Sequence, residues 1–199
     1  LGDQVGKAIY KPLRGERPLW DFPAGLYQRE VAAYLLSEVM DVHVIPPTVE
    51  RDGPFGIGSL QWFIDARFEE HYFTLYEARE DLHDQFRNMA AFDIVANNTD
   101  RKSGHCLIDN DDRIWGIDQG LCFSAEFKLR TVIWEFGGEQ IAPDLIAKIQ
   151  RIVDRPPLEV AALLDADEID AMIERASMLA QGGMFPIDAS GHRYPWPMV

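Results

Sequence analysis

The sequence has few cysteines, no long apolar run and a shortage of basic residues. Cys106 and Cys122 are the only cysteines among 199 residues, too few for a disulfide framework and without the spacing of a zinc site. No apolar run reaches the roughly 18 to 20 residues that span a bilayer. The first residues also lack the charged-then-apolar pattern of a signal peptide. These absences favour a cytoplasmic protein with reduced thiols.

The shortage of positive charge bears on possible partners. Lys and Arg number 19 against 33 Asp and Glu, which leaves a formal net charge of −14. Such a charge repels phosphate backbones and anionic lipid surfaces, so neither nucleic acid nor a membrane is an expected partner. An acidic chain can still bind ATP where magnesium bridges its carboxylates to the phosphates.

Hydrophobic periodicity divides the chain into a mixed first part and a mostly helical second part. Strands are predicted over 5–11, 42–49 and 60–64, with a Gly-rich turn over 53–58 and a later hairpin of 105–108 and 114–117. Helices are predicted over 27–40, 81–97, 142–154, 158–164 and 167–181. The Pro- and Gly-rich stretch 12–25 is expected to be a stiff loop anchored by Trp20 and Phe22.

The densest polar segment lies between the helix predicted over 81–97 and the hairpin. It contains Asp100, and Asp118 follows the second strand of the hairpin. Phosphoryl transfer needs one carboxylate to orient the attacking hydroxyl, a second to hold magnesium on the phosphates, and a lysine to neutralise phosphate charge. Asp100, Asp118 and Lys11 supply these groups, and Glu30 on the first helix is the candidate to fix the lysine.

The same segments resemble a known family. The run Asn98-Thr99-Asp100-Arg101 and the run 117–123 are similar to the catalytic and metal-binding loops of the phosphatidylinositol 3-/4-kinase superfamily, most closely the type II phosphatidylinositol 4-kinases. The segments 8–12, 29–34, 44–48 and 58–63 resemble that family's lysine strand, glutamate helix, following strand and hinge strand, in order. Residues 15–23 and the ending Pro195-Trp196-Pro197 are similar to small actinobacterial kinase-like proteins. The resemblance covers most of residues 8–135.

The resemblance implies an α+β, two-lobed protein-kinase-like fold. Residues 1–65 would form a small mixed N-lobe, and residues 66–199 a mostly helical C-lobe that carries the catalytic and metal-binding loops. The cofactors would be ATP and Mg²⁺. Lys11, paired with Glu30, would contact the phosphates, Asp100 would be the catalytic-loop aspartate, and Asp118 would hold magnesium.

The resemblance also implies contacts farther from the reacting phosphate. The backbone near Gln61, Trp62 and Phe63 would meet adenine, and Arg101 is a further candidate for a phosphate contact. His105 stands five residues after Asp100, where these kinases have asparagine as the second metal ligand. Neutral imidazole binds metal ions but matches hard magnesium poorly.

The expected function is therefore transfer of the ATP γ-phosphate to a hydroxyl of a protein, small-molecule or lipid acceptor, with a soluble acceptor preferred. Two alternatives stay open. A nucleotide-binding pseudokinase would fit His105 and the lack of a glycine-rich hairpin before Lys11 in this sequence. An interaction module would fit if Asp100 and Asp118 only stabilise turns.

Overall fold

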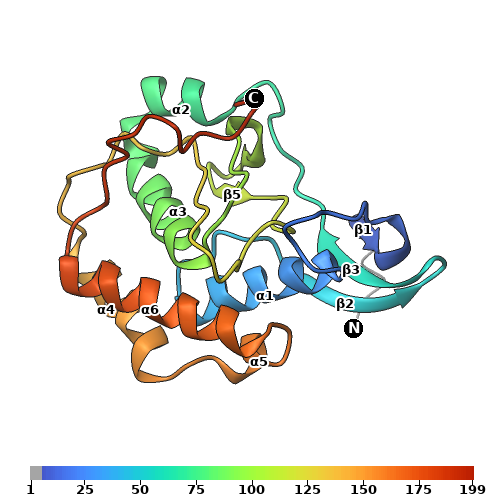
Figure 1. Ribbon diagram of the computed structural model, residues 1–199. Coiled ribbons are helices and arrows are strands. Elements are labelled where there is room, and N and C mark those ends of the chain that lie inside the picture. Colours follow the sequence, from blue (N-terminus) through green and yellow to red (C-terminus); the bar gives the residue numbers. More distant parts are fainter. Residues whose placement is uncertain (1–5) are drawn as a thin grey trace, which may run out of the picture.

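The computed structural model describes residues 6–199 and places a small sheet beside a larger helical part (Figure 1). Strands β1 (Ala8–Pro12), β2 (Thr48–Gly53) and β3 (Gly56–Trp62) form an antiparallel sheet in the order β1-β3-β2. Helix α1 (Leu26–Val39) packs against β2 and β3. The mixed α+β class predicted from the sequence is confirmed.

The larger part is built around a central helix and a short hairpin. Its elements are α2 (Tyr72–Ala78), α3 (His83–Ala96), β4 (Cys106–Ile108), β5 (Ile114–Gly116), α4 (Pro143–Asp154), α5 (Leu158–Ala161) and α6 (Ala166–Gly182). Phe86, Met89 and Phe92 of α3 are fully buried in its core. Helix α6 packs on α3 and α4, and the C-terminal tail runs back across this part toward α2 (Figure 1). Within residues 6–199, no helix combines the length and apolarity required to cross a bilayer.

Gly58 allows β1 to lie close against β3. The register pairs Pro12 with Gly58 and Lys11 with Ser59. A Cβ atom on Gly58 would lie only 2.3 Å from the Lys11 carbonyl oxygen, so a side chain there would force the strands apart. Pro12 ends β1 at the edge of the sheet, where its missing N–H costs no ladder hydrogen bond. This close pairing of β1 with β3 fixes the position of Lys11 in the sheet.

The main differences from the sequence prediction lie around β2. The strand predicted over 42–49 is wrong in its first part, because β2 begins only at Thr48. Pro46 and Pro47 have no N–H for a ladder, and Val44 and Ile45 before them are buried in the core. Part of the turn predicted over 53–58 belongs to β3, and α2 was not predicted.

Candidate active site

Lys11, at the end of β1, meets two carboxylates from distant parts of the chain. Its Nζ pairs with Glu30 of α1 and lies 3.0 Å from Asp118 Oδ1. The second oxygen of Glu30 accepts a hydrogen bond from the Gln119 N–H at 3.1 Å. Burial lowers the pKa of Lys11, but the charges of Glu30 and Asp118 outweigh it, so the net pKa is raised. Lys11 is therefore positively charged and held in place by the two carboxylates.

Asp118 follows β5 in a left-handed backbone conformation with φ of 63°. Aspartate tolerates this region better than most residues. Burial raises the pKa of Asp118, but the charge and hydrogen bond of Lys11 more than compensate, so the net pKa is lowered. Asp118 is ionised, with Oδ1 on Lys11 and Oδ2 turned toward His105.

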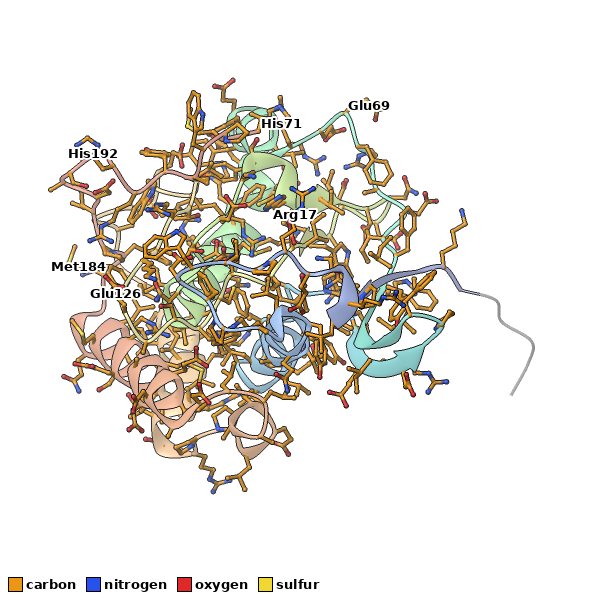
Figure 2. The ribbon with its side chains drawn as sticks, turned by 45° about the vertical axis from the view of Figure 1, so that its right-hand side comes forward. Arg17, Glu69, His71, Glu126, Met184 and His192 are labelled. Atoms are coloured by element: carbon orange, nitrogen blue, oxygen red, sulfur yellow. The ribbon has the colours of Figure 1, made fainter. Side chains whose placement is uncertain are left out.

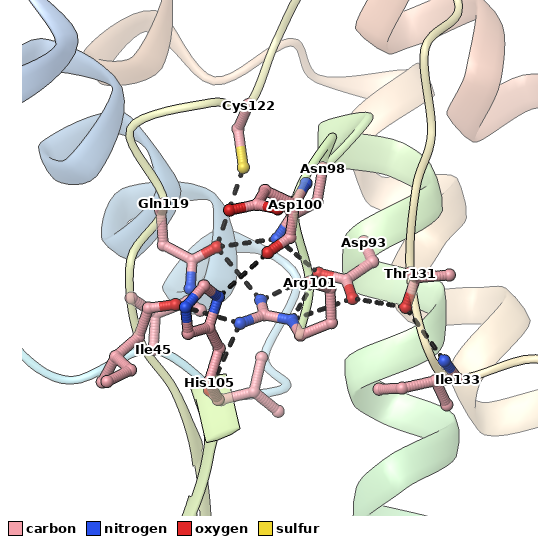
Figure 3. Close-up of polar contacts among 12 residues, drawn as sticks. Ile45, Asp93, Asn98, Asp100, Arg101, His105, Gln119, Cys122, Thr131 and Ile133 are labelled. Atoms are coloured by element: carbon pink, nitrogen blue, oxygen red, sulfur yellow. Dashed lines mark hydrogen bonds and ion pairs between the residues drawn. The ribbon is translucent and has the colours of Figure 1, made fainter. Parts of the chain in front are cut away.

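His105 faces Asp118 with a lone pair. Its Nδ1 lies 2.9 Å from the Asp100 carbonyl, a contact that requires the proton on Nδ1 (Figure 3). Its Nε2 lies 3.7 Å from Asp118 Oδ2. Burial, reinforced by the charge of Arg101, lowers the pKa of His105, so the ring is neutral at neutral pH. An imidazole nitrogen and a carboxylate oxygen that face each other are both groups that can bind a cation.

This pair of ligands suits a metal ion that is held largely by a nucleotide. Among residues 6–199, no group of three or more His, Cys, Asp or Glu side chains surrounds a metal position. Magnesium in nucleotide sites is commonly held by one or two carboxylates plus phosphates and water. The donor set of Asp118 and His105 fits such an ion, with the nitrogen favouring a softer one.

Asp100 begins a loop that α3 holds in place. Its N–H donates to Asn98 Oδ1 at 3.0 Å, and the Asn98 amide donates in turn to Asp93 and Gln119 at 3.1 and 3.2 Å. The Asp100 carboxylate lies 3.2 Å from Lys102 Nζ. The predicted catalytic aspartate is thus at a fixed position on the same side of the molecule as Lys11 and Asp118.

Arg101 lies behind the site, in the core of the larger part (Figure 3). Its Nη2 lies 2.8 Å from Asp93 and 3.0 Å from the Gln119 side chain, and its Nη1 donates to the Ile117 carbonyl at 3.1 Å. The fully buried guanidinium lines none of the cavities of the cleft. This position corrects the expectation that Arg101 contacts phosphate. Its role is to hold the loops that carry Asp100 and Asp118.

Two cavities meet at Lys11 and Asp118, the two residues of the described chain that line both. The hinge cavity, about 340 Å³, is also lined by Ile9, Gln61, Trp62, Phe63, Ile64, Phe68, His105, Leu107 and Ile117. The strap cavity, about 390 Å³, is lined on its other sides by Pro12, Gly15, Glu16, Arg17, Leu19, Leu26, Tyr27, Glu30, Asp100, Gly120 and Leu121. The predicted site residues are therefore brought together, with Arg101 as the exception.

The predicted hinge segment, residues 61–63, uses most of its hydrogen-bonding groups for contacts with neighbouring parts of the sheet. Gln61 is buried and its side chain donates to Thr48 at 3.0 Å. The Trp62 and Phe63 amides donate to the carbonyls of Pro47 and Lys7, at 2.8 and 3.0 Å. Contact of this segment with adenine stays a prediction, and it would rest on side chains and carbonyls of Trp62 and Phe63 rather than on their amides.

The segment 13–25, which we call the strap, forms the outer wall of the strap cavity. The Glu16 carboxylate accepts the amides of Gly25 and Tyr27 at 2.9 and 2.8 Å, which caps the start of α1. Phe22 is buried as expected, but Trp20 is 95% exposed, so it does not anchor the loop. Figure 2 labels Arg17 on the strap, and Arg17 lines the strap cavity together with Leu26 and Tyr27 of α1. The sequence predicted a stiff loop here but not that it walls a cavity, because the contacts of Glu16 with Gly25 and Tyr27 depend on how the loop folds back on α1.

No family model matches the sequence. Protein Rv2133c of Mycobacterium tuberculosis is 36% identical over 235 residues, which cover 99% of this chain and 84% of that protein. The chain belongs to the Rv2133c family.

The Rv2133c-family chain also resembles solved kinase structures. The Golgi casein kinase matches it with a TM-score of 0.53 at 12% identity, over 96% of this chain and 69% of that one. The same kinase with Mn and ADP bound gives a TM-score of 0.54 at 14% identity, over 98% and 72%. At these identities the likeness concerns the fold alone. This Rv2133c-family protein therefore has a kinase-like fold, as the sequence predicted.

Proposed function

We propose that this Rv2133c-family protein is a phosphotransferase that moves the γ-phosphate of ATP to a hydroxyl group. The observation that carries the proposal is the meeting of Lys11, Glu30 and Asp118 at the junction of two cavities, with Asp100 lining one of them. A lysine, its carboxylate partner and a separate metal-binding carboxylate are the parts on which phosphoryl transfer depends.

In this proposal the hinge cavity holds the nucleotide. Its base would lie near Trp62 and Phe63, and Lys11, held by Glu30, would neutralise phosphate charge. Asp118 Oδ2 and His105 Nε2 would hold the divalent ion, which supplies charge neutralisation at the transferring phosphate. Because Glu30 also accepts the Gln119 N–H, the lysine and the metal-binding segment keep a fixed relative position.

The acceptor would enter the strap cavity. Asp100 lines this cavity and not the hinge cavity, so it can orient a hydroxyl on the side of the phosphate opposite the base. A volume of about 390 Å³ is in the range of small-molecule sites. The enclosing strap therefore favours a small molecule or a flexible chain end over a folded protein surface. The resemblance to phosphatidylinositol kinases would place a lipid headgroup here, which the net charge of −14 disfavours.

Thermal stability with and without nucleotide tests this proposal. We expect Mg-ATP or Mn-ATP to raise the melting temperature, and Lys11→Ala and Asp118→Asn each to remove the rise. Lys148→Ala, on α4 away from the cleft, is the matched control and should keep it. Transfer of labelled γ-phosphate to water or to added alcohols is measured in parallel. Absence of any nucleotide-dependent stabilisation in the unaltered protein would refute the proposal.

A nucleotide-binding pseudokinase is the second candidate, and His105 is the observation that favours it. An imidazole nitrogen at this position binds magnesium less well than an amide oxygen would. This function predicts stabilisation by nucleotide without consumption of ATP. Measurable ATP turnover with either Mg²⁺ or Mn²⁺, lost in Asp118→Asn, would exclude it.

A further inference from the structure

Arg29 joins helix α1 to the larger helical part. It precedes Glu30 in the sequence, and its side chain is buried. Its Nη2 lies 2.5 Å from Glu168 Oε1, and its Nη1 donates to the Cys122 carbonyl at 2.7 Å. The ring of Phe22 lies 5.3 Å from the guanidinium carbon. One side chain of α1 therefore contacts α6, the segment after Asp118 and the strap.

Glu168 is itself held firmly. It is the third residue of α6, and its second carboxylate oxygen accepts the Asp165 N–H at 3.1 Å, which completes a capping box. Farther along α6, Met172 and Ala176 are fully buried in the core of the larger part. Arg29 is thus paired with a residue of an element that packs within the larger part.

Two neighbouring residues of α1 hold the segment 118–122 at both of its ends. Glu30 accepts the Gln119 N–H, and Arg29 donates to the Cys122 carbonyl. Because the same Glu30 pairs with Lys11, an outward shift of α1 would break this pair together with the buried Arg29–Glu168 pair. Water does not replace a buried ion pair without an energetic penalty, since each charge would lose its partner in the protein interior.

We propose that Arg29 and Glu168 are positioning residues that lock α1 against the larger part, so that the Lys11–Glu30 pair is assembled before nucleotide binds. The inference rests on the proposed function, because the value of the assembled pair lies in binding phosphates. In protein kinases the placement of the corresponding helix is a point of control. Here contacts internal to the fold set that placement.

Hydrogen exchange and nucleotide affinity test the lock. Arg29→Lys keeps the charge but loses the forked contact, and Glu168→Gln keeps the size and the cap of α6. In both variants we expect amides of α1 and of 118–122 to exchange about tenfold faster, and the Kd for Mg-ATP to rise about tenfold. Arg87→Lys, at a surface ion pair with Glu139 that lines neither cavity, is the control and should change neither.

The Glu30→Gln background separates positioning from general structural support. If Arg29 acts through Glu30, Arg29→Lys should change the Kd less than twofold in that background. An equal tenfold rise in both backgrounds would overturn the positioning role, and unchanged exchange of α1 in both variants would overturn the lock. If the unaltered protein binds no Mg-ATP, the proposed function fails, and faster exchange in the variants would still support the lock itself.

Discussion

Two ion pairs on either side of Gln119 have opposite surroundings. The Gln119 side chain accepts from Arg101, which pairs with Asp93, and the Gln119 N–H donates to Glu30, which pairs with Lys11. Arg101 has no exposed surface, and all three of its nitrogens donate inside the core. Lys11 lines two cavities. The comparison teaches that a cation with every donor satisfied holds loops in place, whereas one open to a cavity is available to a ligand.

The largest expected effect on stability is at the pair of Arg101 and Asp93, which we call the enclosed pair because both side chains are fully buried. Arg101→Met leaves the buried Asp93 without its partner, so we expect the free energy of unfolding to fall by about 3–5 kcal/mol. Urea denaturation followed by tryptophan fluorescence measures it. Arg87→Met, at a surface pair with Asp84 and Glu139, is the control, with an expected loss of about 0–1 kcal/mol. A loss of the same size in both variants would contradict the structural role of Arg101.

The open pair, Lys11 and Glu30, should show a smaller loss of stability and a larger loss of binding. Lys11→Met is expected to lower the free energy of unfolding by about 1–3 kcal/mol, because the buried Glu30 carboxylate loses its cation but keeps the Gln119 N–H as a donor. The Kd for Mg-ATP should rise roughly 10- to 100-fold, because a charged contact to phosphate is lost. Isothermal titration calorimetry gives the affinity, and denaturation gives the stability. The distinction between the two pairs would break down if Lys11→Met unfolded the protein and left the affinity of the remaining folded fraction unchanged.

A smaller effect is expected at Asp118 and His105, the proposed metal-binding side of the open pair. His105→Asn would replace the proposed nitrogen ligand by an oxygen ligand, so the affinity ratio of Mg²⁺ to Mn²⁺ in the presence of ADP should rise by about tenfold. Electron paramagnetic resonance of Mn²⁺, with Mg²⁺ as competitor, measures the ratio. His192→Asn, on the exposed C-terminal tail, is the control. A ratio that is equal in all three proteins would show that His105 is not a ligand.

The smallest effect is expected at an exposed ion pair, which serves as a baseline for the other two. His43 lies 2.8 Å from Glu38 and 2.9 Å from Asp41, and its hydrogen bond to Glu38 is the main reason that its pKa is raised. A raised pKa stabilises the fold below the ordinary value of about 6.5, and this stabilisation is lost as the pH rises through the folded-state pKa.

His43→Gln should therefore lower the free energy of unfolding by less than about 1 kcal/mol near pH 6. The difference from the unaltered protein should disappear toward about pH 9. Denaturation curves at a series of pH values measure it. A difference that grows with rising pH would show that the charged form of His43 does not contribute.

The residues around the open pair could be predicted from the sequence, whereas the enclosed pair of Arg101 and Asp93 could not. Phosphoryl transfer restricts which residue types can serve, so Lys11, Glu30 and Asp118 were recognisable by type and order, and the structure brings them together. Arg101 was misjudged because it adjoins Asp100 in the sequence, although its side chain turns inward to Asp93. Asp93 on the apolar face of the helix predicted over 81–97 was the available signal for a buried partner.

Longer-range features had no local signal at all. Arg29 and Glu168 are separated by 139 residues, and nothing in either neighbourhood specifies the other. Most of the elements were predicted with small errors at their ends, because periodicity encodes them locally, whereas α2 was missed. The start of β2 was missed because the burial of Val44 and Ile45 depends on the finished core rather than on alternation along the strand.

The left-handed backbone at Asp118 limits how this position can change during evolution. Most side chains would pay a conformational cost of about 1–2 kcal/mol there, whereas asparagine and glycine would not. A descendant that gives up the carboxylate is therefore expected to carry Asn or Gly at 118 rather than Ala or Ser. In an alignment of the family, that particular exchange would mark lineages that lost the proposed phosphate chemistry and kept the fold.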